Sequence, residues 1–134
     1  MKVLFVCTGN TCRSPFAEAV ARSEGHIDVE SAGLAAYAGD EPPADAIIVA
    51  RELGVDLSSH HARALTEDML ERADVVVGMT TAHVSALDGR GARGKTRLLG
   101  DADLDDPIGG GPAAYRRAYV RIEREVRKLL GEAT

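Results

Sequence analysis

A short apolar run, Val3–Val6, leads directly into the segment Cys7–Pro15, whose sequence is CTGNTCRSP. A continuous apolar run is typical of a parallel strand that is buried on both faces. Pro15 suits the first turn of a helix, and the residues after it predict a helix to about Ser23. The segment therefore joins the end of a buried strand to the beginning of a helix. Such a turn gathers backbone N–H groups at the positive end of a helix, which favours an anion.

Side chains in this loop indicate nucleophilic attack on a bound phosphoryl group. At the strand end, Cys7 would be held by the anion site as a thiolate, which is a nucleophile. Arg13 offers a planar fork of donors that matches two oxygens of a phosphate, and Ser14 can donate a hydrogen bond to the sulfur. Gly9 permits the turn, while Asn10 can adopt a left-handed conformation or brace the loop. A lone cysteine after a strand is more often a small core residue, but the combination favours the anion site.

The rest of the sequence predicts strands and helices in alternation. The expected strands are residues 3–6, 27–30, 75–79 and 96–99, with residues 31–33 breaking the second one. The expected helices are residues 15–23, 44–53, a short one capped by Thr66, 80–87 and 112–130, with a turn over 89–94. The last helix has one apolar face, formed by Tyr115, Tyr119, Ile122, Val126 and Leu129.

This alternation predicts an α/β fold, in which a parallel sheet is covered by helices on both faces. We expect a single domain over residues 1–134, because the sequence contains no repeat and no linker. Ligands of such folds bind beyond the carboxyl ends of the strands, and Cys7 follows the first strand at that end.

The composition makes some partners improbable. The chain has 134 residues, of which 45% are hydrophobic and 28% charged, and its formal net charge is −5. This charge gives no electrostatic reason to expect nucleic acid or an anionic membrane as a partner. No apolar run approaches the length of a membrane span, and the run near the N-terminus is too short for a signal peptide. Cys7 and Cys12 are too close in sequence to staple a secreted fold, so we expect a cytoplasmic location.

The segment Cys7–Pro15 resembles the signature loop of the low-molecular-weight protein tyrosine phosphatases. The resemblance extends to Ser31–Gly33, to Asp56–His60 and to the pair Asp106-Pro107, so it covers nearly the whole chain. It implies a single domain with a four-stranded parallel sheet flanked by helices, in the flavodoxin-like arrangement. It also implies a phosphorylated protein substrate, a two-step reaction through a phosphocysteine, and no metal or other cofactor. A monomer or a weak dimer is expected.

The resemblance assigns roles to particular residues. It implies that Cys7 is the nucleophile, that Arg13 stabilises the transferred phosphoryl group, and that Asp106 is the general acid, although Asp105 is adjacent. It implies that Ser14 stabilises the thiolate and that Asn10 and His60 support the loop. The expected phosphate-binding loop consists of Thr8, Gly9, Asn10, Thr11, Cys12, Arg13 and Ser14.

The choice of phosphorylated side chain depends on residues at the rim of the site. Tyrosine-specific members usually carry aromatic residues after the Asp-Pro pair, whereas Ile108 and two glycines follow it here. Thr11 stands where those members have a larger aliphatic residue, and in this it resembles the bacterial protein arginine phosphatases. Tyr37 can supply one aromatic wall. We therefore favour phosphoarginine as the substrate, with phosphotyrosine as the alternative.

The same residues also allow other functions to be compared with a phosphatase. An arsenate reductase can be built on the same fold, but it needs cysteines beyond Cys7 and Cys12. A phosphopeptide-binding module without catalysis would be expected to lack the nucleophile, the arginine or the acid. Cys12 is either a core residue or a partner for a reversible disulfide with Cys7. We treat the remaining histidines as surface or structural residues: His26, His61 and His83. The acidic loop after residue 100 lacks the glycine and glutamate of a calcium site, so no metal is expected.

Overall fold

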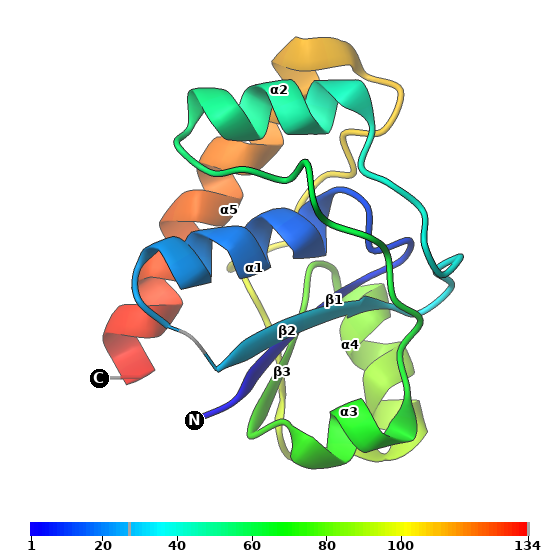
Figure 1. Ribbon diagram of the computed structural model, residues 1–134. Helices are drawn as coiled ribbons and strands as arrows, with labels where there is room; N and C mark the ends of the chain where they lie inside the picture. The colour runs from blue at the N-terminus through cyan, green and yellow to red at the C-terminus, as the bar shows by residue number, and fades with distance from the viewer. Residues whose placement is uncertain (27, 134) are drawn as a thin grey trace.

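A parallel sheet of four strands forms the centre of the protein (Figure 1). This computed structural model describes residues 1–26 and 28–133. The strands lie in the order β2-β1-β3-β4, and every neighbouring pair is parallel. Their bounds are β1 Val3–Cys7, β2 Val29–Gly33, β3 Val75–Gly78 and β4 Thr96–Leu98. The predicted α/β class and four-stranded parallel sheet are confirmed.

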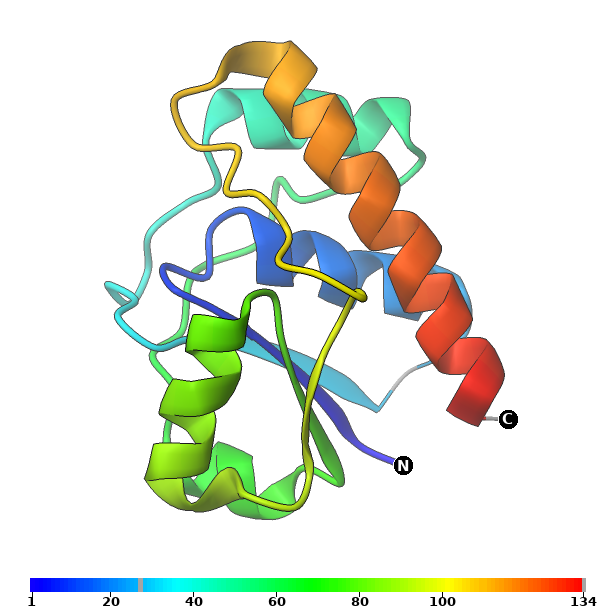
Figure 2. The ribbon, with the colours of Figure 1, turned by 180° about the vertical axis from the view of Figure 1, so that it is seen from behind.

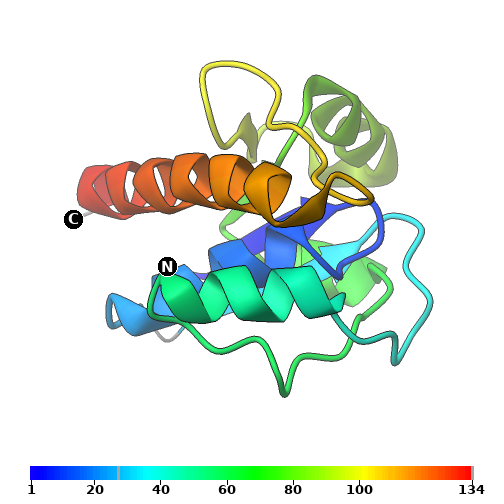
Figure 3. The same ribbon diagram turned by 90° about the horizontal axis from the view of Figure 1, so that it is seen from above.

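Helices cover both faces of this sheet, as predicted (Figures 1 and 2). On one face lie α1 (Arg13–Ser23), α2 (Ala44–Glu52) and α5 (Gly111–Ala133). On the other face lie α3 (Glu67–Arg72) and α4 (Thr81–Leu87), followed by the short π-helical segment η1 (Asp88–Ala92). Seen from above in Figure 3, α2 and α5 run on either side of α1.

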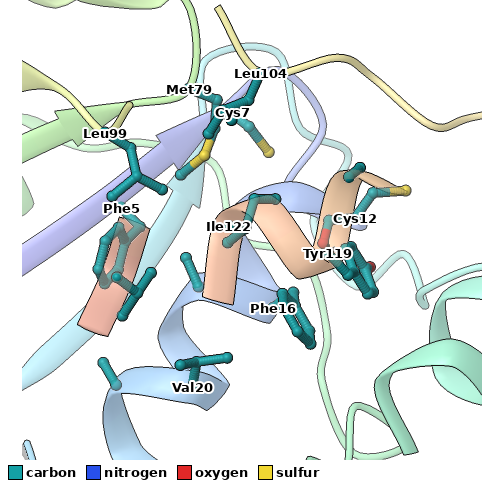
Figure 4. Close-up of a cluster of buried hydrophobic side chains, with 14 of the residues drawn as sticks. Phe5, Cys7, Cys12, Phe16, Val20, Met79, Leu99, Leu104, Tyr119 and Ile122 are labelled. Atoms are coloured by element: carbon teal, nitrogen blue, oxygen red, sulfur yellow. Dashed lines mark hydrogen bonds between the residues drawn. The ribbon is translucent and has the colours of Figure 1, made fainter. Parts of the chain in front are cut away.

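The central strand β1 divides the core into two clusters because successive side chains of a strand point to opposite faces. Val3 and Phe5 pack with α1, α2 and α5, whereas Leu4 and Val6 pack with α3 and the residues after α4. Figure 4 shows the larger cluster, with Phe5 beside side chains of α1 and α5. Burial of each such side chain stabilises the fold by about 1.5–3 kcal/mol. The predicted apolar face of α5 is confirmed, because all five of its residues are buried.

The second strand differs from its prediction. It runs from Val29 to Gly33, so the predicted break at 31–33 is wrong, and residue 27 lies outside the described residues. Ser31 pairs with Phe5 and Gly33 with Cys7 in parallel register. Pairing with a central strand therefore overrides the low strand propensity of small residues.

Small residues are required at the end of β2 because the loop after β1 lies against it. A Cβ atom built on Gly33 would lie 2.6 Å from the carbonyl oxygen of Thr8 and 3.0 Å from the backbone nitrogen of Asn10. The amides of Leu34 and Ala35 donate to the carbonyls of Cys7 and Thr8, at 2.9 Å each. The two chain segments are thus held together by their backbones.

The helix boundaries agree with their predictions more closely than those of β2 do. The Thr66 side chain accepts a hydrogen bond from the amide of Met69, which confirms it as the cap of α3. The predicted turn over 89–94 is only partly correct, because α4 continues into η1, inside which Gly91, with φ of 95°, breaks the helical conformation. Within the described ranges, no helix combines the length and the apolar character that a bilayer crossing needs.

The order of the strands positions a site. β2 and β3 lie on either side of β1, so the chain leaves β1 in one direction and later returns on its other side. Ligands of doubly wound sheets bind at this switch point, beyond the carboxyl ends of the strands. The segments that follow β1, β2, β3 and β4 all begin at that edge.

We expect Gly33→Ala to destabilise the protein because its Cβ meets two backbone atoms that cannot rotate away. Overpacking of this kind costs about 1–3 kcal/mol. Chemical denaturation measures the change in unfolding free energy. Gly89→Ala is the matched control, because nothing lies within 4 Å of a Cβ built there. Equal stabilities for the two variants would contradict the assigned close approach.

Candidate active site

The loop between β1 and α1 presents unpaired backbone donors. Asn10 has a φ of 54°, a left-handed conformation that a residue with a side chain rarely adopts. Among the described residues, none accepts a hydrogen bond from the backbone N–H groups of residues 9–12. Asn10 and Cys12 are nevertheless buried. Buried N–H groups without protein partners, followed by the beginning of α1, form a cradle for an anion.

The thiol of Cys7 lies at the end of β1 and is 3% exposed. Its Sγ is 2.9 Å from Oγ of Ser14 in the first turn of α1. Nδ2 of Asn10 donates to the same Oγ at 2.8 Å. Because the serine oxygen accepts from Asn10, the serine hydroxyl proton is available to the sulfur. This contact holds a hydroxyl against the sulfur at the floor of the cradle.

Asn10 is held by partners from distant parts of the chain. Its Nδ2 also donates to Oγ of Ser31 on β2 at 3.0 Å, and its Oδ1 accepts from the amide of Arg63 at 2.9 Å. Ser31 in turn donates to the buried carboxylate of Glu18 at 2.5 Å. The loop is therefore fixed by a continuous buried network that begins at the nucleophile.

His60 supports the same asparagine through its backbone. Nε2 of His60 donates to the carbonyl oxygen of Asn10 at 2.8 Å. Burial lowers the pKa of His60, so the ring is neutral at neutral pH and Nε2 carries its proton. The structure thus brings together the three residues that the sequence singled out as support, Asn10, Ser14 and His60.

Arg13 and Asp106 face each other at the site. The Arg13 side chain is buried, and its Nη1 donates to the carbonyl of Leu104 at 3.0 Å. Nη2 of Arg13 lies 3.7 Å from Oδ2 of Asp106, whose side chain is 48% exposed. The other carboxylate oxygen, Oδ1, accepts from the amide of Ile108 at 3.1 Å. In the described part of the chain, Asp105 has no comparable contact with Arg13, so Asp106 is the aspartate of the pair that faces the arginine.

His83 is a site residue that the sequence analysis missed. Its Nδ1 accepts from the amides of Met79 and Thr80, so Nε2 carries the proton and donates to Oγ1 of Thr8 at 3.0 Å. Burial and the charge of Arg13 lower its pKa. The pattern Thr80-x-x-His83, directly after a buried strand, was the available signal, since that strand ends at the same edge as β1.

Two tyrosines of α5 hold the far end of the loop. Tyr119 donates from its hydroxyl to the carbonyl oxygen of Cys12 at 2.8 Å, and its ring stacks on Phe16 with centroids 3.9 Å apart. The Tyr115 hydroxyl lies 3.3 Å from Sγ of Cys12. Burial raises the pKa of the Cys12 thiol, so this sulfur is protonated and packs as a core atom. Figure 4 shows Cys12 close to Tyr119.

The expected specificity residues lie at the rim. Tyr37, on the segment after β2, is 78% exposed, and Ile108, between β4 and α5, is 58% exposed. Thr11 is half-buried, and its Oγ1 is 3.7 Å from Sγ of Cys12. Over residues 1–26 and 28–133, no group of three or more acidic, histidine or cysteine side chains is arranged to hold a metal ion.

Comparisons with known proteins agree on one family. The model of the low molecular weight phosphotyrosine protein phosphatase family matches residues 2–134. A protein-arginine-phosphatase from Geobacillus stearothermophilus is 35% identical over 138 residues, covering 96% of this chain and 93% of the relative. The low molecular weight protein-tyrosine-phosphatase PtpB from Staphylococcus epidermidis is also 35% identical, covering 96% of each chain.

Solved structures give the same result. The YwlE arginine phosphatase from Geobacillus stearothermophilus superposes with a TM-score of 0.92 at 34% identity, covering 98% of this chain and 92% of its own. The tyrosine phosphatase Wzb from Escherichia coli K30, in complex with sulphate, superposes with a TM-score of 0.93 at 27% identity, covering 99% and 98%.

A parallel α/β sheet whose first loop carries a cysteine, an anion cradle and an arginine defines a cysteine-dependent phosphatase. The protein belongs to the low molecular weight phosphotyrosine protein phosphatase family. The resemblance seen in the sequence is thereby confirmed. Members of this family are protein phosphatases that react through a phosphocysteine.

We expect the protein to lose stability as pH falls below neutrality. His60 and His83 have pKa values below the ordinary value of about 6.5. The unfolded chain therefore binds more protons than the folded one below that pH. This contribution to stability is complete above about pH 6.5 and is lost as pH falls through the folded pKa values.

Unfolding by denaturant at several pH values between about 7.5 and 5 measures this loss. The double variant His60→Gln/His83→Gln should show a flatter dependence than the wild type. His61→Gln, which changes an exposed histidine, is the control and should keep the wild-type dependence. An unchanged slope in the double variant would show that these two rings do not titrate as described.

Proposed function

We propose that the protein hydrolyses phosphoarginine side chains of proteins, with Cys7 as nucleophile, Arg13 as phosphoryl ligand and Asp106 as acid and base. The observation that carries the proposal is the convergence of these groups. A thiol that accepts a hydrogen bond from Ser14 lies in the cradle, and the guanidinium of Arg13 lies 3.7 Å from the carboxylate of Asp106.

In the first step, Sγ of Cys7 attacks phosphorus while the bond from phosphorus to the guanidino nitrogen breaks. The electron pair of that bond goes to the nitrogen, and protonated Asp106 supplies a proton to it. Free N–H groups of the loop and the fork of Arg13 bind the non-bridging oxygens, where negative charge redistributes in the transition state. The products of this step are a phosphocysteine and an unmodified arginine side chain.

In the second step, water attacks the phosphocysteine. The Asp106 carboxylate takes a proton from the water as its oxygen bonds to phosphorus, and the phosphorus–sulfur bond breaks. The electron pair of that bond returns to Sγ of Cys7 as a thiolate. Ser14 stabilises this leaving thiolate through the hydrogen bond described above, so the same contact serves both steps.

The preference for phosphoarginine rests on the rim of the cradle. After Asp106 the loop carries Ile108 and glycines, so it offers no aromatic wall to a phenol. Thr11 places a hydroxyl and a methyl group where a larger aliphatic side chain would otherwise stand, which leaves a more polar opening. The protein-arginine-phosphatases of Geobacillus stearothermophilus and Bacillus subtilis, at 35% and 33% identity, support this choice.

Phosphotyrosine is the second candidate, and Tyr37 is the observation that favours it. Its ring is 78% exposed on the segment that follows β2, where it is free to stack on a phenol. A tyrosine phosphatase from Staphylococcus epidermidis is as similar as the first arginine phosphatase. We further propose a cytoplasmic location, supported by the two free buried thiols, and a monomer or weak dimer.

The assigned reaction predicts distinct effects for two variants. Cys7→Ser should abolish turnover of p-nitrophenyl phosphate because the hydroxyl is a far weaker nucleophile at neutral pH. Asp106→Asn should lower kcat by about 10²–10⁴-fold, and more for substrates with poorer leaving groups. Steady-state kinetics on aryl phosphates measures both. Asp105→Asn is the matched control, and a larger loss in that variant would assign the acid to the neighbouring carboxylate.

The substrate preference predicts a further change. We expect the wild type to turn over phosphoarginyl peptides faster than phosphotyrosyl peptides of the same sequence. Thr11→Ile should lower this ratio because it replaces the hydroxyl at the rim by a larger apolar group. Release of inorganic phosphate measures kcat/KM for both peptides, and Thr66→Ile, a helix cap far from the loop in sequence, controls for general damage. A ratio unaffected by Thr11→Ile would remove the basis for the preference.

A further inference from the structure

Two arginines of α5 have no acidic partner among the residues that the structure describes. Arg117 and Arg121 stand four residues apart on one side of the helix, where like charges disfavour each other. Within the residues that the structure describes, neither forms an ion pair. Other arginines of the same helix do: Arg116 pairs with Glu52 at 2.8 Å, and Arg127 pairs with Glu24 at 2.5 Å. The pair is also notable in a protein of net charge −5.

Both arginines line a cavity of about 450 Å³ beside the acid loop. The opposite wall of this cavity is formed by the segment from Leu104 to Pro107, which includes Asp106. Figure 3 shows this segment passing over the beginning of α5. Leu104 also accepts the hydrogen bond from Arg13, so one stretch of chain separates the cavity from the phosphate cradle. The cavity therefore adjoins Asp106, on the same chain segment that contacts Arg13.

We propose that Arg117 and Arg121 form a docking subsite for acidic side chains of the protein substrate, close in sequence to the phosphorylated residue. A guanidinium binds a carboxylate through two parallel hydrogen bonds, and two guanidinium groups in one cavity select for a cluster of negative charge. Asp105 and Asp106 also line the cavity, and Asp106 lies 3.7 Å from Arg13. Since no ion pair within the described residues joins either carboxylate to Arg117 or Arg121, the donors of these two guanidinium groups remain available to a carboxylate of the substrate. The subsite fixes which phosphoproteins are preferred and does not take part in the chemical steps.

This inference rests on the proposed protein phosphatase function, but not on the choice between phosphoarginine and phosphotyrosine. Its experiment therefore uses both kinds of peptide. Each peptide is made in two forms that differ at the four positions before and the four positions after the phosphorylated residue. One form carries glutamates at these positions, and the other carries glutamines. The readout is the ratio of kcat/KM for the two forms within one enzyme variant, so a change in catalytic rate cancels.

We expect the wild type to favour the glutamate form by about fivefold, as two partly exposed ion pairs would give. Arg117→Gln/Arg121→Gln should reduce the ratio to about one, mainly through KM, and added salt should do the same to the wild type. The matched control is Arg124→Gln/Lys128→Gln, which removes two positive charges at the same spacing from the same helix and should keep the wild-type ratio.

Three results would overturn the proposal. The first is an equal ratio in the wild type and in Arg117→Gln/Arg121→Gln, and the second is an equal loss in the control variant. The third concerns free sulfate. If sulfate changes the kcat for p-nitrophenyl phosphate in the wild type but not in Arg117→Gln/Arg121→Gln, the cavity is a site for a free anion. Failure of the wild type to hydrolyse p-nitrophenyl phosphate would instead contradict the proposed function itself.

Discussion

The shape of the phosphate loop depends on Asn10. Its left-handed backbone costs roughly 1–2 kcal/mol for a residue with a side chain, and four hydrogen bonds offset that cost. The amide hydrogens reach Ser14 and Ser31, while the two oxygens accept from His60 and Arg63. These partners come from α1, from β2 and from the segment before α3. One buried side chain therefore fixes the loop to three parts of the fold and directs a hydroxyl proton to the nucleophile.

Much of the phosphate loop could be predicted from the order of residues along the chain. The apolar run before Cys7 and the helix signals after it placed the cradle, whereas only the resemblance to the phosphatase family assigned Asp106 to the same site. Contacts that depend on tertiary structure were not accessible in the same way. Nothing near His83 in the sequence shows that its Nε2 reaches Thr8, because that contact requires β1 and β3 to be neighbours. The second strand was misplaced for the same reason, since pairing with β1 decides its end.

The residues proposed to carry out the reaction are buried, whereas the residues expected to recognise the substrate are exposed. Cys7, Ser14 and Arg13 are almost fully buried and are held by hydrogen bonds from several elements, so their geometry tolerates little change. Tyr37 and Ile108 are mostly exposed, so their side chains pack against few other residues. A fold built in this way can change its substrate without disturbing its chemistry. This agrees with the equal similarity of the protein to relatives named for arginine and for tyrosine dephosphorylation.

The hydrogen bond from Tyr119 to the carbonyl of Cys12 has a consequence for biosynthesis. The loop itself is among the first parts of the chain to be made, yet its partners follow at intervals, with His60 and His83 in the middle and Tyr119 near the end. A ribosome must therefore translate nearly the whole chain before the loop acquires its complete set of contacts. Until then, the carbonyl of Cys12 lacks the hydrogen bond that holds the far end of the loop. The contacts around the reactive sulfur are thus complete only once the finished chain folds.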